Sequence, residues 1–238
     1  LLGDNGIGKS SILQAIALAL CGREQINRLG LAASEFLKRG TEKGSVKIWS
    51  YEQDNPILLE FDRNGFKSDL EDPQTFVLAF GSTRLMPKGG IQPEKDMIPY
   101  LNVANLFDYS VALHNPREWL GSIDQKEFDE RVASAFFDVL ALREKDKVWL
   151  DGGKVLIRQF GDDQELENNS DGYKTVVSLV ADIMRTLSID KATYHNAHGI
   201  VLVDEIGNHL HPRWRLKIVG ALRKAFPRLQ FVVTTHEP

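Results

Sequence analysis

Cysteine is scarce in this sequence, which has one residue of this type, Cys21, among 238. A single cysteine cannot form a disulfide within the chain or supply a thiolate cluster for a metal, and this fits a reducing compartment. No apolar run reaches the ~18 residues that a membrane-spanning helix requires, and the first residues lack the pattern of a secretory signal peptide. We therefore expect a soluble, cytoplasmic protein without a membrane partner.

Excess charge of one sign is absent too, because 29 Lys and Arg residues stand against 33 Asp and Glu residues, a net charge of −4. Such a balance produces no overall field that would attract nucleic acid or anionic lipid, so either partner would need a local patch. The composition of 42% hydrophobic and 26% charged residues excludes a disordered or collagen-like chain and predicts a globular domain.

A phosphate-binding motif is present near the start of the chain. Residues 3–11, GDNGIGKSS, match the pattern G-x-x-x-x-G-K-[ST] and precede a segment with helical apolar spacing. The glycines let backbone N–H groups turn toward phosphate oxygens, and the helix N-terminus adds a partial positive charge. Lys9 would bridge the β- and γ-phosphates, and the Ser10 hydroxyl would bind Mg²⁺. The predicted nucleotide-binding residues are Asn5, Gly6, Gly8, Lys9, Ser10 and Ser11.

A second element of the same chemistry lies 190 to 200 residues further on. Residues 200–205, IVLVDE, are four apolar residues followed by two carboxylates, which is typical of a buried strand that ends at a crevice. Asp204 would hold Mg²⁺ through water, and Glu205 would act as the general base toward the attacking water. An ordinary strand that ends in an acidic turn has the same pattern, so this assignment depends on the phosphate-binding loop. No N-K-x-D motif is present, which favours ATP over GTP as the nucleotide.

Strand and helix periods alternate along the chain and predict an α/β fold, a P-loop NTPase sheet flanked by helices. An antiparallel β insert is predicted over residues 44–80, and a helical segment over residues 116–142. Residues 168–238 contain the last predicted helices and strands. The phosphate-binding loop begins after two residues, so we interpret residues 1–238 as a single domain that is a fragment of a longer chain.

Two further segments contribute candidate site residues. In NNSDGYKTVVSLVADI, from Asn168, the residues Ser170, Asp171 and Gly172 begin a helix whose free N–H groups could face a phosphate. A simple capping turn is the alternative for this segment. In VVTTHEP, His236 follows a buried strand and could hydrogen-bond a γ-phosphate, with an ordinary satisfied polar residue as the alternative.

The loop, the S-x-G helix start, the hhhhDE strand and the final histidine, in that order, resemble the ATP-binding cassette superfamily. Within it, DEIGNHLHPRW (204–214), TTHEP and NSDGYKTVVSLVADI are similar to the ATPase domains of the RecF, SMC and OLD-like group. That group includes defence-associated ATPases of the OLD and PtuA type, whereas a transporter domain would be expected to read L-S-G-G-Q. The resemblance is strong over residues 1–22 and 168–238 and faint between them.

This resemblance implies an activity and assigns roles to particular residues. Residues 170–172 would be the signature element, residues 207–209 the D-loop, and His236 the switch histidine, which with Glu205 would form the catalytic pair. The implied activity is Mg²⁺-dependent ATP hydrolysis by a head-to-tail homodimer formed through the ATP sites. Hydrolysis would gate an attached effector nuclease or a DNA contact, in DNA repair or anti-phage defence.

The sequence departs from the superfamily pattern in two places. Asp171 replaces a glycine of the signature, which brings a negative charge near the γ-phosphate unless the carboxylate caps its own helix. A Q-loop glutamine is missing, and AFGSTR (79–84) is the candidate for its place, with Arg84 as a phosphate or partner contact. A nucleotide-sensing module that binds ATP with little hydrolysis is the rival interpretation, and Glu205 argues against it because a pure binder needs no base.

Overall fold

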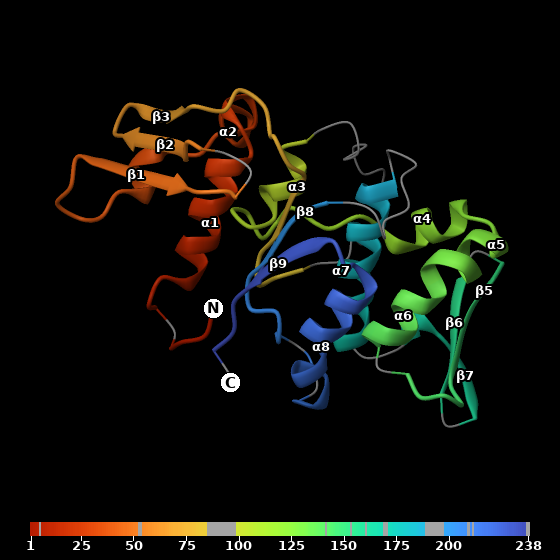
Figure 1. The fold of residues 1–238 in the computed structure, drawn as a ribbon. Coiled ribbons are helices and arrows are strands. Elements are labelled where there is room, and N and C mark those ends of the chain that lie inside the picture. Colours follow the sequence, from red (N-terminus) through yellow and green to blue (C-terminus); the bar gives the residue numbers. More distant parts are fainter. Residues whose placement is uncertain are drawn as a thin grey trace.

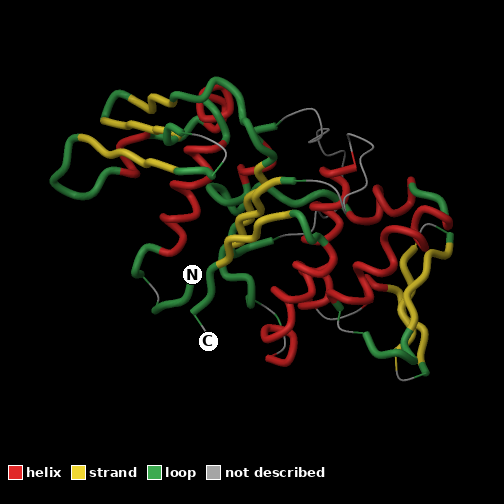
Figure 2. Tube along the Cα trace, viewed as in Figure 1, coloured by secondary structure: helices red, strands yellow, loops and turns green. Residues whose placement is uncertain are grey.

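A three-stranded parallel sheet forms the centre of the molecule, with one antiparallel sheet on each side of it (Figures 1 and 2). The structure is a computed structural model, with no helix in its described part long and apolar enough to cross a membrane. It describes residues 1–4, 6–51, 54–84, 99–140, 142–152, 154–159, 161–168, 171–188, 198–208, 210 and 212–236.

The central sheet has the order β4 (Val77–Phe80), β8 (Gly199–Val203), β9 (Leu229–Val233), and both pairings are parallel. A parallel bridge between Leu2 and Thr235 continues the order beyond β9. Because parallel strands share one carboxyl edge, the segments that follow all four stretches of chain meet there.

Alternate residues of this sheet face two different hydrophobic clusters, as the period of two along a strand requires. Leu78, Phe80, Val201 and Val203 belong to the cluster built with the last helices. Their sequence neighbours Val77, Ala79 and Leu202 belong to the cluster built with the first helix and the β insert. The sheet is therefore covered on both faces, which explains its nearly continuous apolar strands.

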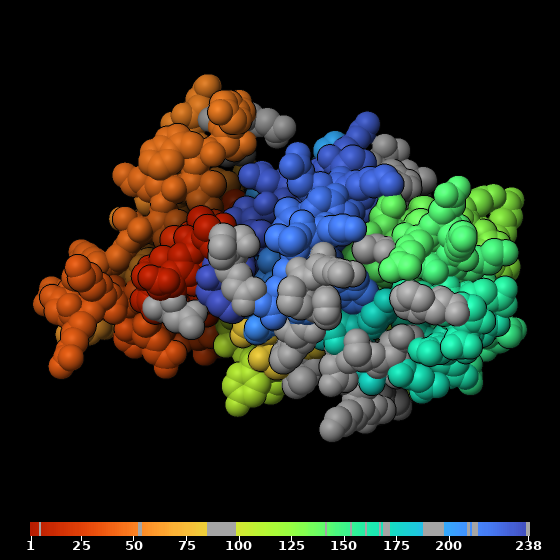
Figure 3. All heavy atoms as spheres, turned by 90° about the horizontal axis from the view of Figure 1, so that it is seen from below, coloured from red at the N-terminus to blue at the C-terminus, as the bar shows by residue number. Residues whose placement is uncertain are grey.

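The first face is covered by the N-terminal third of the chain together with α3 (Leu101–Ala104). The N-terminal third contains α1 (Lys9–Leu20), α2 (Arg23–Leu29) and a 3₁₀ turn (Ala33–Phe36). An antiparallel sheet follows α1, with the order β1 (Lys43–Ile48), β2 (Ile57–Asp62), β3 (Gly65–Ser68). Figure 3 shows α1, α2 and this antiparallel sheet at one end of the molecule, in red and orange.

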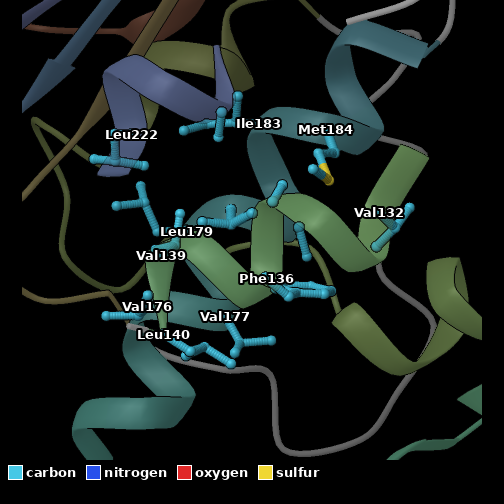
Figure 4. Close-up of a cluster of buried hydrophobic side chains, with 14 of the residues drawn as sticks. Val132, Phe136, Val139, Leu140, Val176, Val177, Leu179, Ile183, Met184 and Leu222 are labelled. Atoms are coloured by element: carbon cyan, nitrogen blue, oxygen red, sulfur yellow. The ribbon is translucent and has the colours of Figure 1, made fainter. Parts of the chain in front are cut away.

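The second face is covered by α7 (Asp171–Ser188), α8 (Pro212–Ala225) and α6 (Ala133–Val139). Figure 4 shows the contact, where Phe136 and Val139 of α6 lie with Leu179 and Ile183 of α7 and Leu222 of α8. The remaining elements of this part are α4 (Pro116–Ser122), α5 (Gln125–Glu127), a π-helical turn (Phe128–Val132), β5 (Lys147–Asp151), β6 (Lys154–Gln159), β7 (Asp162–Glu165) and a 3₁₀ turn (Leu166–Asn168).

These elements confirm the predicted α/β class with flanking helices, an antiparallel insert and a helical segment. One predicted detail differs. The predicted insert extends through residue 80, but β4 pairs with β8 in the parallel sheet, because its residues are apolar on both faces. The helical segment at 116–142 is interrupted at Ile123 and Asp124.

Candidate functional site: a nucleotide-binding edge

Predicted site residues from both ends of the chain lie at the carboxyl edge of the parallel sheet. Leu2 leads into the phosphate-binding loop, and β8 leads into Asp204 and Glu205. The strand β9 leads into Thr234 and His236 beside them. Residues predicted separately to bind phosphate, hold Mg²⁺ and activate water therefore lie at one edge, where α/β proteins bind their ligands.

The loop before α1 has the geometry of an anion-binding turn. Gly6 has φ of 83° and Gly8 has φ of 92°, values in the left-handed region that side chains disfavour. α1 begins at Lys9 with no side-chain cap and no acidic residue in its first turn. Its first N–H groups therefore remain available to phosphate oxygens, which supports the predicted binding role of this loop. Asn5 lies outside the described residues, and Ser11 is exposed on the first turn of α1.

Lys9 is buried at this edge, with 7% of its surface exposed. Its Nζ donates to the carbonyl oxygens of Gly3 at 2.7 Å and Asp4 at 2.9 Å. The same nitrogen lies 3.7 Å from Oε1 of Glu205. The lysine and the predicted general base are thus near neighbours. This is the arrangement expected if both lie beside the γ-phosphate.

The side-chain oxygens of Ser10 and Asp204 lie next to each other. The Ser10 hydroxyl donates to Oδ2 of Asp204 at 2.7 Å, and the Thr234 hydroxyl donates to Oδ1 at 2.5 Å. Asp204 is 7% exposed and Thr234 is fully buried. Mg²⁺ prefers one or two carboxylates together with hydroxyl, water and phosphate oxygens, so this donor set fits it. No cluster of three or more His, Cys, Asp or Glu residues that could hold a metal occurs in the described part of the chain.

Glu205 is held in an unusual conformation. Its φ is 46°, in the left-handed region that a residue with a side chain rarely adopts. Its N–H donates to the hydroxyl of Thr234 at 2.7 Å, and its Oε2 lies 2.7 Å from Nδ1 of His236. The two predicted catalytic residues, Glu205 and His236, are therefore in direct contact.

Arg84 differs from its predicted role as a phosphate or partner contact. The side chain is 6% exposed, and its guanidinium donates to the carbonyl oxygens of Gly81, Asp204 and Glu205. Burial lowers the pKa of Arg84 to about 10, although the nearby carboxylates of Asp204 and Glu205 act in the opposite direction. Arg84 therefore contacts the backbone of Asp204 and Glu205 and is buried beneath the predicted site.

The predicted signature element is described in part. Ser170 lies outside the described residues, Asp171 is the first residue of α7, and Gly172 is buried. α7 packs in the cluster on the second face of the sheet, whereas α1 packs on the first. In the predicted D-loop, the Asn208 side chain donates to the Ser82 carbonyl at 3.3 Å, and residue 209 lies outside the described residues.

Thr234 is a site residue that sequence reasoning did not single out. Its hydroxyl receives the Glu205 N–H and donates to Asp204, so it joins the two acidic residues. The only signal available in the sequence was its position at the end of an apolar strand, two residues before His236. Such a threonine has no distinguishing pattern, so its role required the structure.

The second half of the chain matches a known family. Residues 94–238 match the family described as "AAA domain, putative AbiEii toxin, Type IV TA system". The matched span is more than half of the chain and includes Asp204, Glu205 and His236. The chain belongs to this family of AAA domains. Lys9 and Ser10 of this AAA domain precede the matched span.

Three curated relatives are similar to this AAA domain. "Septu protein PtuA" of Bacillus mycoides (strain KBAB4) is 38% identical over 245 residues, which cover 100% of this chain and 34% of that protein. "Retron Vc95 probable ATPase" of Vibrio cholerae serotype O1 biovar El Tor is 36% identical over 117 residues, 48% of this chain and 22% of that protein. "Retron Ec83 probable ATPase" of Escherichia coli is 47% identical over 72 residues, 29% of this chain and 13% of that protein. The chain therefore spans 34% or less of each of these relatives.

Among solved structures, an Smc head domain with an extended coiled coil, bound to the C-terminal domain of ScpA and derived from Pyrococcus furiosus, has the same fold. Its TM-score is 0.54 at 14% identity, with 99% of this chain and 82% of that chain covered. The fold match and the PtuA relative confirm the resemblance to the SMC and PtuA type of ATPase domain stated from the sequence.

Proposed function

We propose that this AAA domain binds ATP with Mg²⁺ and hydrolyses it at the carboxyl edge of the parallel sheet. The observation that carries the proposal is the convergence of Lys9 and Ser10 with Asp204 and Glu205, joined by a hydrogen bond of 2.7 Å between Ser10 and Asp204. Two relatives are named as probable ATPases, which supports the same reaction.

Each residue has a distinct role in this proposal. The loop N–H groups and Lys9 bind the phosphates through charge-assisted hydrogen bonds. Ser10 and Asp204 hold Mg²⁺, which neutralises charge on the β- and γ-phosphates when it is bound. Glu205 accepts a proton from the attacking water, and His236 orients the Glu205 carboxylate from its Oε2 side, the side opposite Lys9.

The oligomer and the output of hydrolysis are further parts of the proposal. We expect two copies to join head to tail, so that the start of α7 in one copy closes on the ATP held by the loop of the other. The two elements pack on opposite faces of the sheet, which supports a site completed by a second copy. Closure and hydrolysis would gate an attached effector nuclease or a DNA contact, of the DNA-repair or anti-phage type, in the cytoplasm.

The proposal is tested on the full-length protein with two variants. Lys9→Ala should lose ATP binding, because its ammonium is the buried cation that faces the predicted phosphate position. Glu205→Gln should bind ATP and hydrolyse it about 10² to 10⁴-fold more slowly, the usual effect of removing a general base. Binding is measured by titration calorimetry and hydrolysis by phosphate release.

Lys126→Ala is the matched control, since Lys126 is an exposed lysine of α5 with 81% of its side chain accessible. It should bind and hydrolyse ATP as the unmodified protein does. Retained ATP affinity in folded Lys9→Ala would overturn the assigned site. If the unmodified protein hydrolyses ATP slowly and Glu205→Gln hydrolyses it at the same rate, the result would favour the rival nucleotide-sensing module.

A further inference from the structure

The guanidinium of Arg84 connects three backbone carbonyls at the end of β8. Its Nη1 donates to Gly81 O at 2.9 Å and to Asp204 O at 2.8 Å, and its Nη2 donates to Glu205 O at 3.2 Å. One buried side chain thus ties the segment that follows β4 to both acidic residues of the site. Arginine suits this task because its planar group presents several donors in a fixed geometry.

The segment that carries Arg84 is itself held in place by Asn105, a buried residue with 3% of its surface exposed. The Asn105 side chain accepts from the Gly81 N–H at 2.8 Å and donates to Thr83 O at 3.2 Å and to Val111 O at 2.7 Å. A Cβ on Gly81 would lie 2.6 Å from the Asn105 carbonyl oxygen, so the two backbones are in close contact. Arg84 therefore extends from a fixed support.

Glu205 needs such support because of its backbone conformation. Within the described part of the chain it is the one non-glycine residue with positive φ, at 46°. Such a conformation costs free energy and persists only where neighbours impose it. Thr234 accepts from the Glu205 N–H at 2.7 Å. The Glu205 carbonyl accepts from Arg84 at 3.2 Å and from the Asn208 N–H at 3.0 Å, so the residue is held at both of its backbone polar groups.

Fold stability alone does not account for Arg84. Its guanidinium is buried, with 6% of the residue exposed, and its Nε has no hydrogen-bond partner in the described part of the chain. Buried charges and unpaired buried donors reduce stability compared with a well-packed apolar side chain. A residue that is unfavourable for stability at the edge of a reactive site is more simply explained by a role in that site.

We propose that Arg84 is a positioning residue for Glu205: by holding the Asp204 and Glu205 carbonyls it fixes the Glu205 carboxylate between Lys9 and His236. This inference rests on the proposed function, in which Glu205 is the general base. In the structure, Glu205 Oε1 lies 3.7 Å from Lys9 Nζ and Oε2 lies 2.7 Å from His236 Nδ1. Rotation of the Glu205 backbone would break both relationships while leaving the loop and Ser10 in place.

The kinetic test compares Arg84→Lys and Arg84→Gln with the unmodified full-length protein. Lysine keeps the charge but cannot reproduce the fork that reaches three carbonyls. We expect kcat for ATP hydrolysis to fall about 10 to 10²-fold in Arg84→Lys, since small misplacements of a catalytic group cost that much, and further in Arg84→Gln. The ATP KM should stay within about 3-fold, because the loop, Lys9 and Ser10 bind the nucleotide.

Arg23→Gln is the matched control. Arg23 also donates to a backbone carbonyl, that of Ser68 at 2.9 Å, but it lies in α2 beside the antiparallel insert. Its removal should leave kcat unchanged. An Arg84→Lys protein that is folded by circular dichroism and has unchanged kcat would overturn the inference. A loss of ATP affinity as large as the loss of kcat would overturn it as well, in favour of a phosphate contact.

A double-mutant cycle separates positioning from a general structural effect. If Arg84 acts through Glu205, then Arg84→Lys should change kcat by less than about 2-fold in a Glu205→Gln background. An equal loss in both backgrounds would contradict the inference.

Hydrogen exchange gives a readout that does not depend on ATP hydrolysis. The Glu205 amide should exchange faster in Arg84→Lys and remain protected in Arg23→Gln, because its hydrogen bond to Thr234 depends on the held conformation. Unchanged exchange would overturn the inference. If the unmodified protein does not hydrolyse ATP, the proposed function fails, and this exchange measurement still decides whether Arg84 holds Glu205.

Discussion

The hydroxyl of Ser10 and the carboxylate of Asp204, separated by 194 positions in the chain, are joined by a hydrogen bond of 2.7 Å. Ser10 lies in the first turn of α1, and Asp204 is the first residue after β8. The hydrogen bond therefore connects the helix on one face of the sheet to the central strand itself. Any movement of the loop that separates these two oxygens would also separate Lys9 from Glu205.

This relationship predicts the effect of Ser10→Ala. The substitution removes one predicted Mg²⁺ ligand and leaves Lys9 and the loop backbone intact, so ATP should still bind. Hydrolysis should require a higher Mg²⁺ concentration, by about 10-fold or more, since Mg²⁺ is held by few protein groups. The measurement is phosphate release over a Mg²⁺ titration.

Ser122→Ala is the control for that titration, because Ser122 also donates its hydroxyl, to the Trp119 carbonyl at 2.7 Å in α4, away from the nucleotide edge. Its Mg²⁺ dependence should match that of the unmodified protein. The same Mg²⁺ midpoint in Ser10→Ala would show that Ser10 is not a ligand.

The loop and the acidic strand end were predictable because their residues carry a local pattern. G-x-x-x-x-G-K-[ST] reflects a backbone requirement that few sequences meet by chance. A run of four apolar residues before two carboxylates is a common pattern, and it was informative because it occurs together with that loop. The contact between Glu205 and His236 was not predictable, since it depends on the register of β8 and β9, in which Val203 lies opposite Val233. The role of Arg84 was also hidden, because its partners are backbone carbonyls and a backbone group has no sequence pattern. The role of Thr234 was hidden because its partners, the Glu205 N–H and the Asp204 carboxylate, lie 29 and 30 positions away in the chain.

The strand β7 (Asp162–Glu165), which pairs with β6, has no strand pattern in the sequence for a different physical reason. Its residues are mostly exposed, so burial gives no alternating pattern to detect. This strand is stabilised by pairs of side chains across the sheet. In one such pair, Arg158 Nη2 donates to Asp163 Oδ2 at 2.7 Å.

Cys21 provides a prediction about accessibility and pH. Burial raises the pKa of its thiol to about 12, whereas an exposed thiol titrates near 8.5. At pH 9 the native protein should therefore react with iodoacetamide far more slowly than the urea-unfolded protein, because only the thiolate is nucleophilic. The folded pKa lies above the unfolded one, so the contribution of Cys21 to stability is complete below about pH 8.5 and declines as the pH rises toward 12.

An exposed position in the same chain gives the control for this experiment. Ser45 lies exposed on β1, so a Cys21→Ser, Ser45→Cys double variant carries a single accessible thiol. That thiol should react at the same rate in the native and unfolded states. Equal rates for native and unfolded protein with the natural Cys21 would show that the thiol is accessible, contrary to its 3% exposure.

The start of α7 leads to a prediction about the dimer. α7 begins at Asp171, directly after Ser170, and its first N–H groups need an acceptor. If Ser170 only caps the helix, Ser170→Asp should keep activity, because aspartate caps as well as serine does. If Ser170 faces the γ-phosphate of a second copy, the added negative charge should abolish hydrolysis while the protein stays folded.

Mixing two inactive variants tests whether that site is shared between copies. A Lys9→Ala chain retains Ser170, and a Ser170→Arg chain retains Lys9, so a heterodimer has one intact site and one site with both lesions. Activity should return in part when the two proteins are mixed with ATP, and sedimentation should show that association depends on ATP. Each variant alone, at the same total concentration, is the reference and should stay inactive. If heterodimers form and no activity returns, or if monomers hydrolyse ATP at every concentration, then Ser170 does not act across the interface, and its role is to cap α7.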